Sequence, residues 1–181
     1  MSIDWQNYLN ESTMNTTKKN FLAEEIILEN EIVKLVPFNR YDALKLQSII
    51  FDDSVWKYMG LFVKNRNDLE DYIDNTLELQ GKDHYAFLIF DKRTNEFAGS
   101  TRFGNINLKS EKLEIGWTWL GKKFHGKGIN HIAKFELLKY CFENVGLRRV
   151  QFSADLENLA SQKAILKLGA KQEGVFRNNY I

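Results

Sequence analysis

The chain has 181 residues, of which 44% are hydrophobic and 13% aromatic, so its composition favours one globular domain with a substantial core and argues against disorder. Its formal net charge is +1, from 25 Lys and Arg against 24 Asp and Glu, which gives no electrostatic reason to expect a nucleic acid or a membrane surface as partner. The single cysteine, Cys141, excludes an internal disulfide, and the sequence lacks a signal-peptide profile and any apolar run of about 20 residues, so we expect a cytoplasmic protein.

The first residues differ in character from the rest of the chain. Residues 1–25 are mostly polar and are expected to form an arm outside the core, ahead of a domain over residues 26–181. At the start of that domain, residues 26–37 are rich in strand formers around Glu29-Asn30, which predicts two strands joined by a tight turn. Pro37 ends the second strand because proline cannot donate a hydrogen bond to a sheet.

Two helices and three strands are expected next. Asn39 is a suitable N-cap for the first helix, and Gly81 ends the second. The short links between the three strands favour an antiparallel meander. The expected segments are helices over residues 41–50 and 68–80 and strands over residues 85–91, 96–103 and 112–119.

The second half of the domain alternates helices with strands. The expected segments are a long helix over residues 128–144, a strand over 148–154, a helix over 158–168 and a last strand over 172–180. A meander followed by this alternation predicts an α/β (α+β) fold, with a mixed, mostly antiparallel central sheet and helices on both faces.

A glycine-rich turn precedes the long helix. Its glycines let the backbone turn tightly and approach a ligand, and the free N–H groups at the helix start favour an anion. The turn contains three glycines and three lysines: Gly121, Gly126, Gly128, Lys122, Lys123 and Lys127. It predicts a phosphate site, with a plain connection as the alternative. Neither the P-loop nor the dinucleotide fingerprint fits its spacing.

The segment His125-Gly126-Lys127-Gly128-Ile129-Asn130 resembles the acetyl-CoA-binding turn of the GNAT superfamily, Arg/Gln-x-x-Gly-x-Gly/Ala, with His125 and Asn130 as departures. Other segments are similar to the branch of ribosomal-protein N-terminal acetyltransferases. These are Glu114-Ile-Gly-Trp117, Asp155-Leu-Glu-Asn158-Leu-Ala-Ser161, Lys167-Leu-Gly-Ala170 and Glu173-Gly174. The resemblance runs from about Ile26 to the end of the chain and implies the GNAT-type acyl-CoA N-acyltransferase fold.

The resemblance implies transfer of an acetyl group from acetyl-CoA to a primary amine, either a protein N-terminus or a small molecule. It implies that a splayed strand and the glycine-rich turn hold the co-substrate. The implied contacts are Thr118, Trp119, Leu120, His125, Gly126, Lys127, Gly128, Ile129, Asn130 and Asn158. For Asn158, capping of the following helix is a second role that is compatible with the first.

Two residues are candidates for the chemistry. Glu114 is the candidate general base, acting through water, and strand alternation would put it on one face with Gly116 and Thr118, opposite Ile115, Trp117 and Trp119. The alternative for Glu114 is a solvated or ion-paired edge carboxylate. Ser161 is the candidate acid or thiolate partner, and its alternative is a solvated or back-bonding serine.

The acceptor site is less determined by the sequence. The resemblance makes Trp56, Tyr58 and Met59 candidates for lining it, with burial in the core as the alternative. Arg102 would meet an acidic group of the acceptor, with a surface arginine as the alternative. His84 and His131 lack partners at metal-ligand spacing, so we expect no metal site.

The C-terminus departs from the family. Relatives continue into a further strand that completes the sheet, whereas this chain stops at Ile181, so that strand is expected to be missing. The N-terminal arm would supply a strand in its place, in cis or across a homodimer. A non-catalytic CoA-binding or regulatory module on the same fold is the alternative function, and the balanced charge disfavours a nucleotide or RNA binder.

Overall fold

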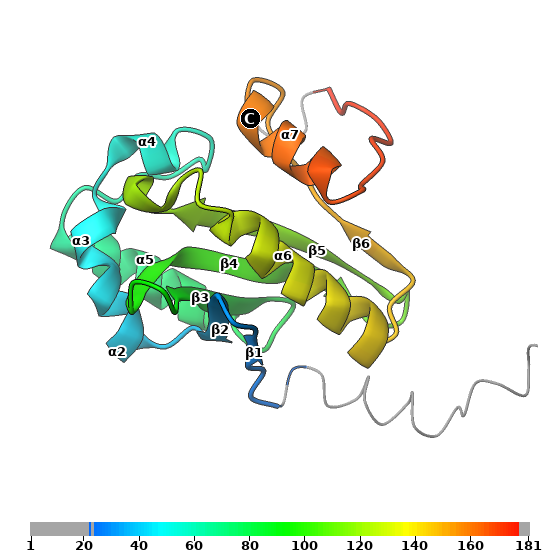
Figure 1. Ribbon diagram of the computed structural model, residues 1–181, viewed down its shortest axis with the longest axis horizontal. Helices are drawn as coiled ribbons and strands as arrows, with labels where there is room; N and C mark the ends of the chain where they lie inside the picture. The colour runs from blue at the N-terminus through cyan, green and yellow to red at the C-terminus, as the bar shows by residue number, and fades with distance from the viewer. Residues whose placement is uncertain (1–21, 23, 178–181) are drawn as a thin grey trace, which may run out of the picture.

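One six-stranded sheet organises the protein in the computed structural model, which describes Leu22 and residues 24–177. The strands lie in chain order, β1 to β6 (Figure 1). Strands β1 to β5 pair antiparallel, and β6 joins β5 in parallel. The bounds are β1 Leu28–Glu29, β2 Val33–Pro37, β3 Tyr85–Asp91, β4 Glu96–Asn107, β5 Lys112–Leu120 and β6 Arg149–Gln151. The predicted mixed, mostly antiparallel sheet is confirmed.

Helices cover both faces of the sheet, as expected. Helix α6 lies on one face, and α5 lies on the other with the shorter helices (Figure 1). The α helices are α2 Arg40–Ala43, α3 Gln47–Ile50, α4 Asp53–Trp56, α5 Arg66–Leu79, α6 Ile129–Lys139 and α7 Leu159–Lys167. The 3-10 turns η2 Leu44–Leu46 and η3 Lys122–Phe124 and the π-helical turn η4 Tyr140–Asn144 complete the set.

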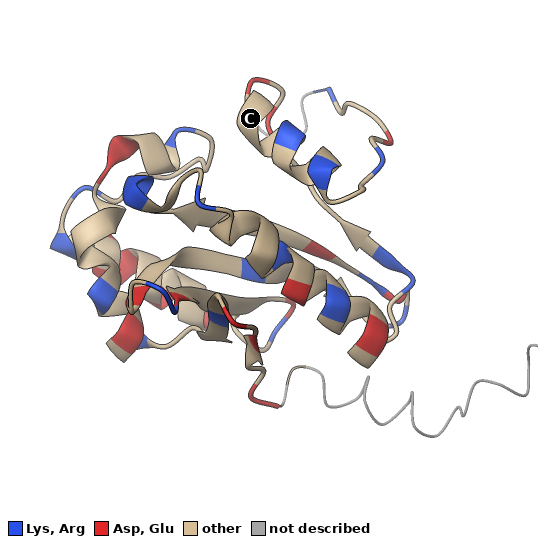
Figure 2. Cartoon of the chain, viewed as in Figure 1, with Lys and Arg blue, Asp and Glu red and all other residues tan. Residues whose placement is uncertain are grey.

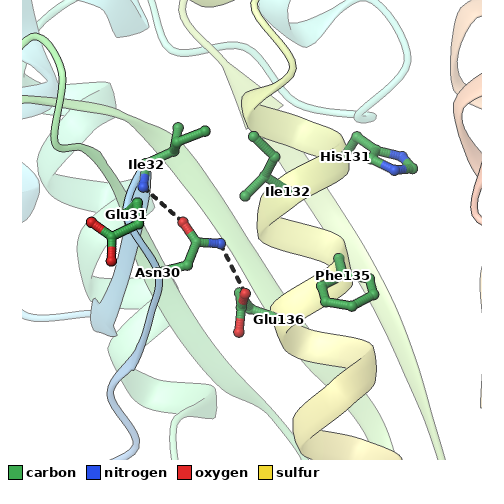
Figure 3. Close-up of a pocket in the computed structure, with 7 residues that line it drawn as sticks. All are labelled: Asn30, Glu31, Ile32, His131, Ile132, Phe135 and Glu136. Carbon is green, nitrogen blue, oxygen red and sulfur yellow. Dashed lines mark hydrogen bonds between the residues drawn. The ribbon is translucent and has the colours of Figure 1, made fainter.

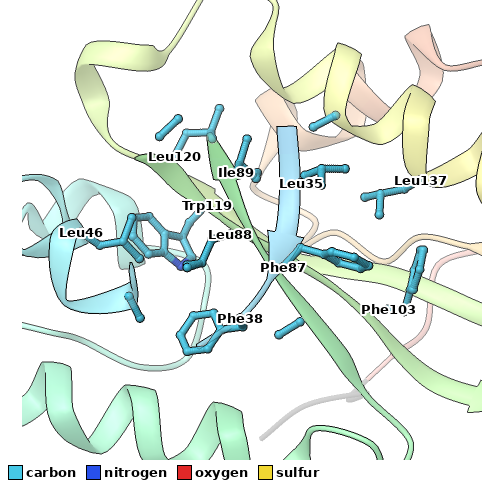
Figure 4. Packing of buried hydrophobic residues seen from close by; sticks show 14 of the residues in the cluster. Leu35, Phe38, Leu46, Phe87, Leu88, Ile89, Phe103, Trp119, Leu120 and Leu137 are labelled. Carbon is cyan, nitrogen blue, oxygen red and sulfur yellow. The ribbon is translucent and has the colours of Figure 1, made fainter. Parts of the chain in front are cut away.

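The core is split by the sheet into two layers (Figure 4). Toward α6, side chains of β2, β3 and β4 meet Leu137. Toward α5, Trp119 packs against Trp56 and Tyr72, with ring centroids 5.3 and 6.3 Å away. Because β3 is buried on both faces, it is an almost continuous apolar run rather than an alternating one.

Side-chain caps decide where the helices begin. The Asn39 side chain accepts a hydrogen bond from the Asp42 N–H, which confirms the predicted cap. The Asn65 side chain accepts from the N–H groups of Asn67 and Asp68, so α5 begins at Arg66, two residues earlier than expected. Charged side chains of both signs are spread over the domain, in line with its small net charge (Figure 2).

The C-terminal part differs from the prediction. Strand β6 has three residues rather than the expected seven, and residues 172–177 form no strand. Those residues are all exposed and have no strand beside them, and an isolated strand leaves its backbone unpaired. The expected last strand is therefore wrong over 172–177, and residues 178–180 lie outside the described residues.

Helix α7 stands apart from the core. None of its residues is buried, and Figure 1 shows it away from the sheet. An ion pair of Arg149 with Glu173 and a hydrogen bond of 3.3 Å from the Tyr58 hydroxyl to the Glu157 carbonyl hold this region. Most of the predicted N-terminal arm, residues 1–21 and 23, lies outside the part of the chain that the structure describes. Among the described helices, none combines the length and the apolar character that crossing a membrane requires.

Candidate functional site

The pairing of strands β5 and β6 stops partway along β5. Their pairing ends where Glu114 lies opposite Gln151, so β5 continues to Leu120 without a β6 neighbour. The Gly121 N–H donates to the Ala98 carbonyl at 2.9 Å, toward β4. Because backbone groups of successive strand residues point to opposite edges, the N–H group of Leu120 faces the open side. This half of β5, the split edge (residues 115–120), has no β6 strand beside it and leaves room for a ligand.

A β-bulge reshapes this part of β5. Trp119 pairs with Ser100 and Gly116 with Arg102, so Trp117 and Thr118 together oppose one residue of β4. Trp117 has φ of 48°, in the left-handed region that few non-glycine residues adopt.

Because of the bulge, the side chains of β5 after Gly116 do not alternate between the faces of the sheet as predicted. Trp117 lies beside Arg102 on the α5 face with Trp119, whereas Thr118 faces α6 and accepts a hydrogen bond from Lys134 at 2.9 Å. The expected grouping of Thr118 with Glu114 is therefore wrong, because one extra residue reverses the side on which the following side chains lie.

Glu114 is held at the point where the strands part. Its side chain is 6% exposed, and its Oε2 accepts hydrogen bonds from Asn105 Nδ2 at 2.9 Å and Gln151 Nε2 at 3.2 Å. No ion pair to Glu114 is found among the described residues. The solvated or ion-paired carboxylate is therefore not what the structure shows: Glu114 is a buried, oriented carboxylate with capacity to accept a further proton or hydrogen bond.

The glycine-rich turn lies at the far end of the split edge. Gly126 and Gly128 have φ of 72° and 80°, which glycine adopts without strain. Gly128 caps α6 without a side-chain hydrogen bond, so the first N–H groups of the helix remain available to an anion. The His125 Nε2–H donates to the Leu120 carbonyl at 2.9 Å and ties the turn to β5.

The other turn residues contribute in different ways. Lys122 and Lys127 are exposed, and Lys123 pairs with Glu96 at 2.6 Å. Ile129 is buried, so only its backbone can meet a ligand. Asn130 Oδ1 is buried without a hydrogen-bond partner within the described residues. Because Oδ1 only accepts hydrogen bonds, it suits a donor group of a ligand, whereas the N–H groups at the start of α6 suit a phosphate.

Two predicted residues lie on the detached α7 region. Asn158 caps α7, since its Oδ1 accepts from the Ser161 N–H at 3.1 Å. Ser161 is half-buried, and no hydrogen bond between described residues joins it to Glu114. The structure therefore brings Glu114, the split edge and the glycine-rich turn together, and leaves Ser161 on a separate element.

The residues that were predicted to line the acceptor site differ in burial. Trp56 is fully buried and its Nε1–H donates to the Ile50 carbonyl at 2.7 Å, so it belongs to the core. Tyr58 and Met59 are half-buried. Arg102 is 6% exposed and not a surface arginine: its Nη2 donates to Thr76 Oγ1 at 3.2 Å and its Nε has no partner in the described chain.

Burial of Arg102 lowers the pKa of its guanidinium, because the charged form is poorly solvated there. No carboxylate pairs with Arg102 in the described part of the chain, and its guanidinium lies 5.5 Å from the centre of the Trp117 ring.

Sequence reasoning missed Lys134, which the structure places under the split edge. It lies on α6 in line with the buried residues Ala133, Leu137 and Cys141. A lysine in phase with the apolar stripe of a helix was the available signal.

The clearest hollows lie away from Glu114. One, of about 310 Å³, lies between α6 and the β1–β2 turn (Figure 3), where Asn30 Nδ2 donates to Glu136 Oε1 at 2.8 Å. Another, of about 350 Å³, lies between α3 and η3. Neither touches the split edge. The described residues also contain no group of three metal-ligating side chains.

Comparison with known proteins identifies the family. Residues 33–171 match the family described as acetyltransferase (GNAT) domain. The N-acetyltransferase YoaA of Bacillus subtilis (strain 168), described as uncharacterized, is 26% identical over 155 residues, covering 83% of this chain and 86% of YoaA. YdaF of the same organism, whose name proposes a ribosomal N-acetyltransferase, is 33% identical over 93 residues, which span 51% of this chain and about half of YdaF, 49%.

The fold agrees with this match. A GCN5-related N-acetyltransferase from Brucella melitensis superposes with a TM-score of 0.78 at 24% identity, covering 87% of this chain and 72% of that one. With the family match over most of the chain, the protein belongs to the GNAT acetyltransferase family.

Proposed function

We propose that this protein transfers an acetyl group from acetyl-CoA to a primary amine. The observation that carries the proposal is the meeting, on one strand, of an unpaired backbone edge, an anion-binding turn and a buried carboxylate. The open edge of β5 would bind the acetyl donor, and the glycine-rich turn would bind its phosphates. The buried carboxylate would act as the base for the amine.

The donor would lie along the split edge. The Leu120 N–H faces that side, and an N–H donor fixed there would stabilise charge on the thioester oxygen. The turn from His125 to Asn130 would hold the pyrophosphate through the N–H groups at the start of α6, which no side chain caps. Acetyl-CoA supplies the acetyl group as an activated thioester.

The acceptor would approach on the α5 face, where Glu114, Trp117 and Arg102 lie. Glu114 takes a proton from the amine through water. The amine nitrogen then bonds to the carbonyl carbon, and the carbon–sulfur bond breaks with its electron pair passing to sulfur. The products are the acetylated amine, the CoA thiolate and the proton held by Glu114. The hydroxyl of Ser161 would hydrogen-bond the sulfur when α7 closes on the donor.

A protein N-terminus is the acceptor class that the name of YdaF supports, and small amines remain the second class. Arg102, whose Nε lacks a partner in the described residues, would add a preference for acceptors that carry an acidic group near the amine. Comparing peptides that differ only in an acidic residue beside the N-terminus separates these preferences.

Glu114→Gln tests the proposed base. The amide keeps the size of the side chain but cannot take a proton, so kcat/KM for the best amine should fall by about 10²–10⁴-fold. The dissociation constant of acetyl-CoA, measured by calorimetry, should stay unchanged. Glu143→Gln, at an exposed position of the π-helical turn η4, is the matched control and should keep full activity.

A second function has a specific observation in its favour: Ser161 lies on a helix with no buried residue. A CoA-binding module without turnover would leave such a helix undocked. Acetyl-CoA binding by the wild-type chain without transfer to any peptide or small amine would establish that alternative. Equal kcat/KM for wild type and Glu114→Gln would instead remove Glu114 from the mechanism.

A further inference from the structure

Lys134 is a lysine buried beneath the split between β5 and β6. It is 6% exposed, and its Nζ donates to Thr118 Oγ1 at 2.9 Å. The ammonium also lies 5.2 Å from the centre of the Phe152 ring. No carboxylate of the described residues pairs with it. An ammonium has three N–H donors, and the Thr118 hydroxyl is the one acceptor that the described residues offer it.

A lysine in this position lowers the stability of the folded protein unless a ligand contacts its ammonium. Burying an ammonium with one neutral partner is unfavourable, and burial lowers the pKa of Lys134 to about 8. The neighbouring buried positions hold Ala133 and Leu137 of α6 and Cys141 of η4, so an apolar residue would suit this site better for folding alone. Groups that a fold leaves unsatisfied at such a cost concentrate at functional sites.

The position of Lys134 relative to Glu114 indicates which part of a ligand it meets. Gln151 bonds Glu114, and Phe152, the next residue, lies over the Lys134 ammonium. Glu114 pairs with Gly104, on the α5 face, whereas Lys134 approaches from α6. The carboxylate and the ammonium therefore flank the end of the split from opposite faces of the sheet.

Acetyl transfer changes charge at two atoms. The amine nitrogen loses a proton and needs a base, and the sulfur gains an electron pair and needs a positive partner. The glycine-rich turn, at the other end of the split edge, would take the phosphates, so the thioester end of the donor falls near Glu114. The two flanking groups have the charges that these two atoms require.

We propose that Lys134 is a catalytic residue of the acetyl transfer, whose ammonium hydrogen-bonds the CoA sulfur and stabilises the thiolate formed as the carbon–sulfur bond breaks. The inference rests on the proposed function. The electron pair of that bond goes to sulfur beside Lys134, and the proton of the amine goes to Glu114 on the opposite face. An ammonium suits this task better than the neutral hydroxyl of Ser161, since charge-assisted hydrogen bonds are about twice as strong.

The test follows the thiol of bound CoA, by the ultraviolet absorbance of its thiolate, in the full chain. In wild type the bound thiol should ionise at lower pH than in Lys134→Met, by about one pH unit or a tenfold change in its ionisation constant. Lys139→Met, an exposed lysine of the same helix, is the matched control and should titrate like wild type. Turnover of Lys134→Met should fall on the order of 10²-fold.

The outcomes separate this assignment from the proposed function. An identical thiol titration in wild type and Lys134→Met, with CoA bound to both, would overturn the role of Lys134 alone. Failure of wild type to bind acetyl-CoA or CoA would overturn both proposals. Should Lys134→Met fail to fold, Lys134→Gln removes the charge with a polar side chain and is held to the same expectation.

Discussion

Three charged side chains near the split are buried without a partner of opposite charge in the described residues: Glu114, Arg102 and Lys134. Each costs stability because its charged form is poorly solvated. The sequence indicated Glu114 through a family motif and Arg102 through its place on a predicted strand. The sequence also indicates Lys134, because it places a cation on the apolar face of a helix. Only the tertiary structure shows that no carboxylate of the described residues pairs with it.

The cost of Lys134 gives a measurable pH dependence. Its pKa is about 8 in the folded state against 10.5 for an ordinary lysine. Between these values the unfolded chain binds the additional proton, so the contribution of Lys134 to the free energy of unfolding rises as pH increases from about 8 to 10.5. Wild type should therefore gain stability relative to Lys134→Met by about 3 kcal/mol over this window.

Denaturant unfolding at pH values across that window measures the difference. Burial also raises the pKa values of Cys141 and of Tyr140, the latter to about 12, and these groups lower stability at alkaline pH. Both proteins contain them, so their effects cancel in the comparison. At pH 7, Lys134→Met should be the more stable protein. A wild type that is more stable at pH 7, with no relative change up to pH 10.5, would mean that Lys134 has a structural role.

At the scale of elements, periodicity predicted most helices and strands because local patterns encode them. β3 occupies the predicted residues 85–91, and the cap at Asn39 is where the sequence placed it. The bulge at Trp117 was not predictable, since it depends on how β5 registers against β4. Because of that one-residue shift, Trp117 lies beside Arg102 and Thr118 accepts a hydrogen bond from Lys134. The bulge therefore decides which side chains line each face of the site.

The turn before α6 gives a prediction at this scale. Gly128 has φ of 80°, and an added Cβ would meet only Ile132 Cδ1, at 3.8 Å, so Gly128→Ala has room but adopts a strained backbone. The free energy of unfolding should fall by about 1–2 kcal/mol, and acetyl-CoA should bind more weakly because the N–H groups that face the phosphates shift. Gly174→Ala, an open position with no positive φ, is the control. Unchanged stability and affinity in Gly128→Ala would show that the turn tolerates another conformation.

For the whole molecule, the sequence order of the strands is also their order in the sheet, with the split at the junction of the meander and the parallel strand β6. The meander of β3, β4 and β5 was predictable because short links favour neighbouring antiparallel strands. The position of α7 was not predictable, because none of its residues is buried against the core. Exposed apolar residues gather in this region: Leu156, Leu159, Leu166, Val175 and Phe176.

Calorimetric titration of the full chain with acetyl-CoA, with ATP as a control ligand, tests the account most directly. The split edge and the turn together predict a dissociation constant at or below about 100 μM, which corresponds to about −5.5 kcal/mol. ATP carries phosphates but no pantetheine arm to lie along β5, so it should bind at least about tenfold more weakly, a difference of about 1.4 kcal/mol. Absence of acetyl-CoA binding, or equal affinity for ATP, would contradict the account.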